Sequence, residues 1–232
     1  MNRLALVGYG RMGRMVAELA PAHGFEVAAT LTSADNPEGA GLTAERLAGV
    51  EVAIDFSIAA AVPGNVRRLA ALGIPVVVGA TGWGTELARV RAAVERSGSG
   101  LVYGANFSVG VQIFYRLAAT AARLMAEAEE YGAWAYEIHH DQKKDAPSGT
   151  LLELVRRMEG AGFSRQVDVA SNRAGKVPGT HVLGFDSEAD TITLEHRARS
   201  RTGFAHGALK AARWLLGRTG FYEFGEIWDQ IL

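Results

Sequence analysis

The sequence predicts an α/β protein: a parallel sheet covered by helices in its first part, followed by a smaller α+β domain. Several short apolar runs do not alternate polar with apolar residues, which is typical of strands buried on both faces of a sheet. Segments with helical spacing separate these runs, so each strand is followed by a crossover helix. The rhythm changes after Asn106, where strands and helices are less strictly interleaved. The 232 residues suffice for two domains of this kind.

The elements of the first part follow one another at short intervals. Met12, Val16 and Leu19 share one face of the first expected helix, and Glu86 to Arg96 is amphipathic in the same way. The expected strands span residues 3–7, 25–31, 50–56, 75–79 and 101–103. The expected helices span residues 11–22, about 57–72 and 86–96.

The second part contains a long helix and a hairpin. Ser187, Glu188 and Ala189 separate two runs of strand character, which predicts an antiparallel pair. The expected helices span residues 109–131, 150–158 and 205–216, and the expected strands span residues 133–139, 180–186 and 190–197.

Composition and charge exclude several classes of protein. Hydrophobic residues make up 48% and charged residues 21%, as in soluble globular proteins. The net charge of -1 gives no reason to expect nucleic acid or anionic lipid as a partner. Cysteine is absent, which excludes disulfides and thiolate chemistry and fits a reducing cytoplasm. The longest apolar run, residues 69–80, is interrupted by Gly73 and Pro75, so we expect no membrane span.

Residues 8–13, GYGRMG, match the G-x-G-x-x-G pattern of dinucleotide-binding loops. The segment follows an expected strand and precedes an expected helix, the context that makes this pattern informative. Gly8 permits the tight turn, Gly10 lets a pyrophosphate approach the backbone, and Gly13 lets the helix lie close to the sheet. We therefore expect a Rossmann-type dinucleotide-binding domain, with cofactor contacts from Gly8, Tyr9, Gly10, Arg11, Met12 and Gly13.

The end of the second strand does not decide between NADH and NADPH. An acid about 20 residues after the loop would hold the ribose 2′-hydroxyl of NAD. Here the strand ends in Thr32 and Ser33, whose hydroxyls suit either cofactor, and no arginine follows directly. Two later strand ends carry small residues, consistent either with room for the nicotinamide half or with ordinary turns. These residues are Gly79, Ala80 and Thr81, and Gly104, Ala105, Asn106 and Phe107.

The segment HHDQKKDAPSGT, residues 139–150, combines proton donors with a helix start. Ser148 or Thr150 is a natural N-cap, and N–H groups at a helix start attract a carboxylate. His139 and Lys143 are candidate proton donors for a ligand held there. A solvated surface loop is the alternative. A metal site of His139, His140 and Asp145 is not favoured, because adjacent histidines usually point apart, and we predict no metal.

This segment, EIHHDQKKDAPSGT from Glu137 to Thr150, resembles the signature of the dihydrodipicolinate reductase family. That signature reads roughly E-x-H-H-x-x-K-x-D-A-P-S-G-T. Similarity to the family extends over nearly the whole chain and keeps the family's order. The further segments are GRMG, DFS, GATGW, ANFSVGV, RAGKVPGTHVLGFDSEAD and FAHGALKAARWL.

The resemblance implies a dinucleotide domain of residues 1–106 and 217–232, and an inserted domain of residues 107–216 that binds substrate and forms a homotetramer. It implies NADH- or NADPH-dependent reduction of a small cyclic dicarboxylate in lysine biosynthesis. His139 and Lys143 would handle protons. Substrate contacts would come from His140, Ser148, Gly149 and Thr150. Thr32 stands where the family often has an acid, so cofactor preference stays open.

Two other functions fit the same features. One is a different nicotinamide-dependent reductase of an imino or keto acid. The other is a regulatory module that binds the dinucleotide and has no need of His139 and Lys143. Four basic residues either help to hold a second carboxylate or form a solvated face, and the second interpretation is favoured: Arg173, Lys176, Arg199 and Arg201.

Overall fold

A computed structural model describes residues 1–231. The chain divides into two compact units. The first comprises Met1–Ser108 with Thr202–Leu232, and the second comprises Val109–Arg201. Each unit has its own sheet and its own hydrophobic core.

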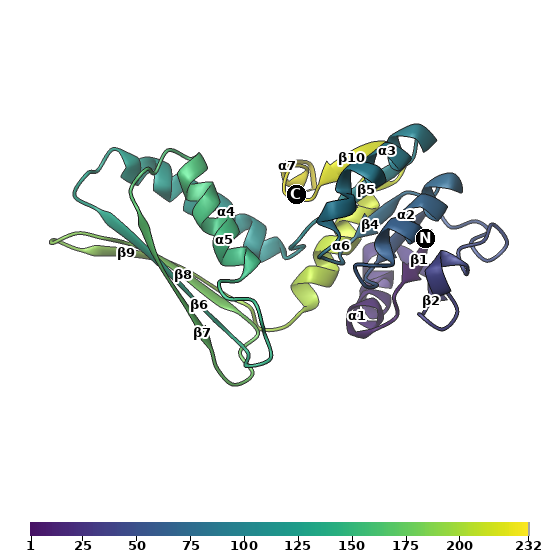
Figure 1. The fold of residues 1–232 in the computed structure, drawn as a ribbon, viewed down its shortest axis with the longest axis horizontal. Helices are drawn as coiled ribbons and strands as arrows, with labels where there is room; N and C mark the ends of the chain where they lie inside the picture. Colours follow the sequence, from purple (N-terminus) through teal and green to yellow (C-terminus); the bar gives the residue numbers. More distant parts are fainter. Residues whose placement is uncertain (232) are drawn as a thin grey trace. The chain divides into compact units, whose positions relative to one another are not determined.

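The first unit is built on a six-stranded, entirely parallel sheet with helices on both faces (Figure 1). The strands are β1 (Asn2–Val7), β2 (Phe25–Leu31), β3 (Val52–Asp55), β4 (Val76–Val78), β5 (Gly100–Tyr103) and β10 (Gly220–Glu223), in the order β10-β5-β4-β3-β1-β2. The helices are α1 (Arg11–Leu19), α2 (Val62–Ala71), α3 (Leu87–Ser97), α6 (Thr202–Leu215) and the short α7 (Trp228–Ile231). The apolar strands fill the centre of this unit, as their sequences predict.

Helix α6 corrects the domain boundary expected at residue 216. The helix packs against α1 and against β3, β4 and β5, so it belongs to the first unit. Its small residues explain the close fit: a Cβ at Gly207 would lie 1.8 Å from the Phe107 carbonyl oxygen. Helices α1 and α6 pack against each other and against the strands, so together they cover one face of the parallel sheet.

The second unit is a four-stranded mixed sheet with two helices on one face (Figure 1). The helices are α4 (Val109–Ala126) and α5 (Gly149–Gly160). The strands are β6 (Gly132–His139), β7 (Val167–Arg173), β8 (Thr180–Asp186) and β9 (Thr191–Arg197), in the order β7-β6-β8-β9. The pair β8 and β9 is antiparallel, which confirms the expected hairpin.

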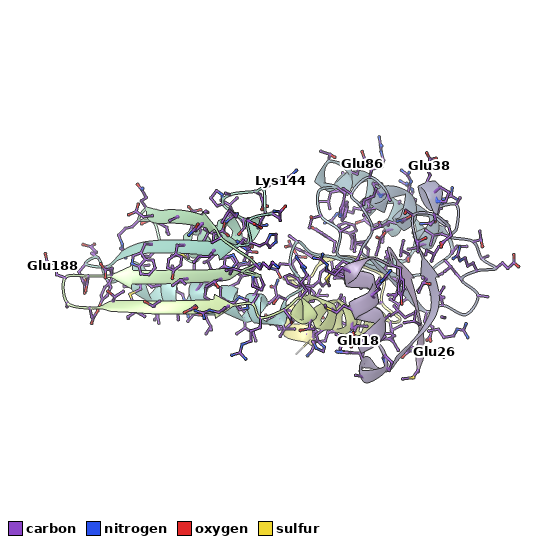
Figure 2. The ribbon with its side chains drawn as sticks, turned by 90° about the horizontal axis from the view of Figure 1, so that it is seen from below. Glu18, Glu26, Glu38, Glu86, Lys144 and Glu188 are labelled. Atoms are coloured by element: carbon purple, nitrogen blue, oxygen red, sulfur yellow. The ribbon has the colours of Figure 1, made fainter. Side chains whose placement is uncertain are left out.

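Strand β6 alternates strictly between the two faces of its sheet. Ala133 and Ala135 pack under the helices, and Glu137 and His139 continue that buried face toward the carboxyl end of the strand. Trp134 and Tyr136 lie on the opposite face, which Figure 2 shows in front of the helices. The alternation therefore places two ionisable residues inside the unit.

Two strands were not expected, and three helices, α1, α2 and α4, are shorter than expected. Strand β7 is mostly polar and exposed, and β10 has four residues, so neither gives a strong apolar signal. Helix α4 ends at Ala126 rather than near residue 131. Within residues 1–231, no helix has the length and apolar character of a bilayer span.

Candidate active site

The glycine loop has the geometry that dinucleotide binding requires. Gly8 has φ +88°, and a Cβ there would lie 2.7 Å from the Phe56 carbonyl group. A Cβ at Gly13 would lie 2.2 Å from the Gly8 oxygen, so α1 approaches the loop as closely as backbone atoms allow. At Gly10, the N-cap of α1, a Cβ would meet nothing within 4 Å. Backbone atoms therefore crowd Gly8 and Gly13, whereas the space in front of Gly10, where a pyrophosphate would approach, is free of protein atoms.

A cavity of about 450 Å³ extends from this loop to the end of β2. Its volume suits the adenosine half of a dinucleotide. The lining includes the loop residues Gly8, Tyr9 and Gly10, the strand-end residues Thr32 and Ser33, and Asn36, Glu38, Ser57, Ile58 and Asn65. The structure thus brings five of the predicted cofactor residues together around one cavity. Arg11, Met12 and Gly13 form the first turn of α1 beside it.

A buried polar network holds the wall of this cavity. Asn36 donates to the Asn65 side chain at 3.0 Å and accepts from Gly41 N. Asn65, on α2, donates to Asp55 at the end of β3 at 2.9 Å. Burial raises the pKa of Asp55, although the bonds from Ser57 and Asn65 oppose that shift. The network ties the loop after β2 to the sheet.

The remaining predicted cofactor residues follow β4 and β5. Because these strands are parallel neighbours of β3, Gly79 and Gly104 lie at the same edge of the sheet as the glycine loop. Gly79 is needed for packing, since a Cβ there would lie 2.1 Å from the Phe56 ring. Phe107 is buried against Phe224, with ring centroids 4.5 Å apart, so its side chain is part of the core. Ala80, Thr81, Ala105 and Asn106 complete the two turns.

Glu137 is the centre of a buried polar cluster in the second unit. Its Oε1 accepts from Ser148 N at 2.8 Å, from Arg173 Nη2 at 2.9 Å and from Ser171 Oγ at 3.1 Å. Its Oε2 accepts from the Ser148 hydroxyl and lies 3.3 Å from ring nitrogens of His139 and His181. Burial alone would raise the pKa of Glu137. The Ser148 hydroxyl and the Arg173 guanidinium outweigh it, so the net pKa lies below the ordinary value.

Ser148 is the N-cap of α5, as predicted, because its hydroxyl accepts from Leu151 N at 3.2 Å. Its own N–H and hydroxyl both donate to Glu137. These contacts give Ser148 a role in anchoring the helix start, and its contact with substrate stays a prediction. A Cβ at the next residue, Gly149, would meet nothing within 4 Å, which leaves space in front of the first turn.

The two buried histidines are held in their neutral form near pH 7. Burial lowers the pKa of His139, and Lys143 and Arg173 lower it further against the opposing Glu137. Burial lowers the pKa of His181 to about 4. The two rings contact each other edge to face, with centroids 5.0 Å apart. His140, the next residue, is half-buried and lies outside this contact.

The loop after β6 is held by Arg173. The guanidinium donates to the carbonyl oxygens of Lys143, at 3.2 Å, and of Asp145. The Lys143 ammonium lies 2.9 Å from the Asp145 carboxylate and remains partly exposed. The prediction that Arg173 lies on a solvated face is therefore wrong, since it joins the loop to the buried Glu137.

Glu137, His139 and His181 also have donor atoms within 4.8 Å of one another, a spacing that could hold a metal ion. Both oxygens of Glu137, however, already accept hydrogen bonds, one of them from a cation. A divalent ion at this point would face Arg173 at close range, so these residues do not fit a metal well. This cluster differs from the set of His139, His140 and Asp145 considered from the sequence.

The first unit has a glycine loop of the dinucleotide-binding pattern on a parallel sheet, and the second has neutral histidines beside a lysine and a helix start on a mixed sheet. These features define an NAD(P)H-dependent oxidoreductase. Two family models agree and together cover nearly all of the chain. Dihydrodipicolinate reductase, N-terminus, matches residues 2–107, and Dihydrodipicolinate reductase, C-terminus, matches residues 110–227. The chain belongs to the dihydrodipicolinate reductase family.

Individual relatives agree with the family models. The 4-hydroxy-tetrahydrodipicolinate reductase of Christiangramia forsetii is 34% identical over 97% of this chain and 96% of that protein. The protein of that name from Methanoculleus marisnigri is 37% identical over 72% of this chain and 71% of that protein. The dipicolinate-bound dihydrodipicolinate reductase from Paenisporosarcina sp. TG-14 has the same fold, with a TM-score of 0.81 at 20% identity over 98% and 99% of the two chains.

Sequence reasoning missed Glu137, Arg173 and His181 as members of one cluster. The signal for Glu137 was present, because Ala133, Ala135, Glu137 and His139 follow the period of two that marks one face of a strand. Nothing local marks Arg173 and His181, which reach the cluster through the pairing of β7 and β8 with β6.

Proposed function

We propose that this chain reduces 4-hydroxy-2,3,4,5-tetrahydrodipicolinate to 2,3,4,5-tetrahydrodipicolinate with NADH or NADPH, in the diaminopimelate route to lysine. The observation that carries the proposal is the match of both halves of the chain to one reductase family, with the family's signature folded around Glu137. The reaction adds a hydride and a proton to the ring and releases water. The need for reduced nicotinamide supports a cytoplasmic location.

The cofactor would lie along the glycine loop and the cavity beside it. Backbone N–H groups at the start of α1 would bind the pyrophosphate, where Gly10 leaves the approach open. The turns after β4 and β5 would hold the nicotinamide half. A bound dihydronicotinamide supplies the hydride.

The second unit would bind the dicarboxylate and move protons. The Gly149 N–H, in the open first turn of α5, suits a carboxylate, with Thr150 and His140 beside it in the chain. Lys143 is the cation that can donate the proton, and Asp145 holds its ammonium. Neutral His139 can accept and pass a proton, since burial lowers its pKa and its Nδ1 lies near Glu137. Glu137 and Ser148 keep this helix start in place.

We also propose that the second unit assembles a homotetramer through the face of its sheet opposite α4 and α5. Trp134 and Tyr136 stack on that face, at 6.0 Å between ring centroids, and Tyr136 is 38% exposed. Such aromatic side chains are enriched at subunit interfaces. Analytical ultracentrifugation tests this directly: a tetramer supports the proposal, and a monomer at micromolar concentration contradicts it.

The reaction is tested by the loss of reduced-nicotinamide absorbance, with substrate generated in place by a synthase from pyruvate and aspartate semialdehyde. We expect turnover, and Lys143→Ala lowers kcat by about 100-fold or more, the usual range for a lost general acid. Lys144→Ala is the matched control, because Lys144 is the exposed neighbour (labelled in Figure 2). Near-normal turnover in Lys143→Ala would contradict the assignment of Lys143.

The same assay separates the two alternative functions. A reductase of another imino acid would show weak competition by pyridine-2,6-dicarboxylate, a planar analogue of the proposed substrate. A regulatory module would bind the dinucleotide without turnover, and substitution of His139 or Lys143 would leave that binding unchanged.

A further inference from the structure

We propose that the ribose end of the cavity selects NADH over NADPH and that Glu38 is the residue that discriminates. The inference rests on the proposed dinucleotide function of this cavity and adds the choice that the sequence left open. The two cofactors differ at the 2′-hydroxyl of the adenosine ribose, which is free in NADH and carries a phosphate in NADPH.

Glu38 gives the cavity its charge. Among the described residues that line it, Glu38 is the one with an ionised side chain. The carboxylate is exposed, and no ion pair to it occurs within residues 1–231. It follows Asn36 and Pro37 in the loop that leaves β2, the segment that contacts the ribose in folds of this type. A carboxylate there accepts a hydrogen bond from a ribose hydroxyl and repels a phosphate.

The end of β2 does not compensate for that charge. Thr32 donates from its N–H, at 3.0 Å, and from its hydroxyl, at 3.1 Å, to the Asp35 carboxylate. Both groups that could otherwise bind a phosphate oxygen are thus committed to an anion of the chain itself. On this proposal Thr32 does not favour the phosphate of NADPH.

Arg46 is a cation in contact with this strand end, and it is already paired. Its Nη2 lies 3.2 Å from the Asp35 carboxylate and donates to the Thr30 carbonyl at 3.1 Å. Its Nη1 reaches the Asp35 carbonyl. Recruiting Arg46 for a phosphate would break these contacts and leave Asp35 facing the ligand.

The loop that carries Glu38 is fixed rather than loose. Asn36 is buried and hydrogen-bonded to Asn65 on α2, which in turn bonds to Asp55. Glu38 lies two residues after this anchor, with φ +50°, and the buried Gly39 follows it. The backbone that carries Glu38 is therefore fixed at the wall of the cavity.

Two arginines offer the rival interpretation. Arg67 and Arg68, on α2, line a neighbouring hollow that shares Glu38 and Ala61 with the cavity. Neither lines the cavity itself, and the Arg68 stem packs against Gly39. If they bound the 2′-phosphate, NADPH would be preferred and Arg68→Gln would abolish that preference.

The test is isothermal titration of the intact protein with NADH and with NADPH, with no other substrate, in wild type, Glu38→Gln and Glu26→Gln. Glu26 is the control for charge, because it lies on β2 near the end opposite to the cavity, about 20 Å from Thr32. We expect NADH to bind the wild type at least roughly ten-fold more tightly, the size of one well-placed charge effect. Glu38→Gln should reduce that ratio at least about three-fold, and Glu26→Gln should leave it unchanged.

The outcomes separate this inference from the proposed function. Equal or tighter binding of NADPH overturns the inference alone, as does an unchanged ratio in Glu38→Gln. A preference for NADPH that Arg68→Gln removes overturns it in favour of the arginines. If neither nucleotide binds, the proposed dinucleotide site fails and the inference fails with it.

Discussion

Replacing Glu137 with glutamine tests whether the buried cluster holds the second unit together. The variant keeps the shape of the side chain but removes the charge that Arg173 Nη2 meets at 2.9 Å and that Ser148 N meets at 2.8 Å. Removing one partner of a buried ion pair costs about 3–5 kcal/mol. Arg173 retains some solvent exposure and two carbonyl acceptors, so we expect a smaller cost, about 2–3 kcal/mol.

Hydrogen–deuterium exchange of the β6 and β8 amides measures this loss within the second unit, whatever the first unit does. A loss of about 2–3 kcal/mol corresponds to exchange roughly 30–150 times faster. Glu195→Gln is the matched control, since Glu195 lies on β9 of the same sheet but pairs with Arg197 at the surface. The control should cost under about 1 kcal/mol. If Glu137→Gln exchanges no faster than Glu195→Gln, Glu137 does not organise the cluster.

Two further predictions follow from the pKa of one histidine and from the spacing of the loop glycines. Burial lowers the pKa of His181 from 6.5 to about 4, so the unfolded chain binds the proton more tightly. The stability that neutral His181 contributes should be complete above pH 6.5 and should be lost as the pH drops toward 4. In His181→Gln the free energy of unfolding should fall less steeply over the same range, which urea titrations at each pH measure. Gly10→Ala should leave the melting temperature unchanged and weaken NADH binding, because its Cβ meets only the space for the pyrophosphate. Gly13→Ala should lower both, since its Cβ would lie 2.2 Å from Gly8; equal effects of the two variants on melting would contradict this.

The parallel sheet of the first unit could be predicted because its strands are apolar on both faces and its glycine loop has a mechanical reason for each glycine. The boundary at α6 could not. An amphipathic helix shows that it covers something, but its sequence does not show which of two sheets it covers. Strands β7 and β10 were missed because one is polar at a sheet edge and the other has four residues.

In the candidate site, too, local patterns predict single residues but not the partners that reach them from distant strands. The segment from Glu137 to Thr150 carries its own signals: a period of two, adjacent ionisable residues and an N-cap. The arginine that completes it lies 36 positions from Glu137 along the chain and meets it only through strand register. In that register His139 pairs with Arg173, and Glu137 pairs with His181. A shift by one residue would turn both partners to the opposite face.

The strand register places Arg173 where it joins the buried Glu137 carboxylate to the loop after β6. Arg173 bonds to Glu137 and to the carbonyl groups of Lys143 and Asp145, so one side chain joins the sheet to the loop that carries the proposed proton donor. Glu137 in turn fixes the N-cap of α5, whose first turn faces the proposed carboxylate site. An uncharged residue at position 137 would leave Arg173 without its anion and the helix start without its anchor. The acid at the head of the family signature therefore positions the loop and the helix start, and His139 and Lys143 are the residues proposed to move protons.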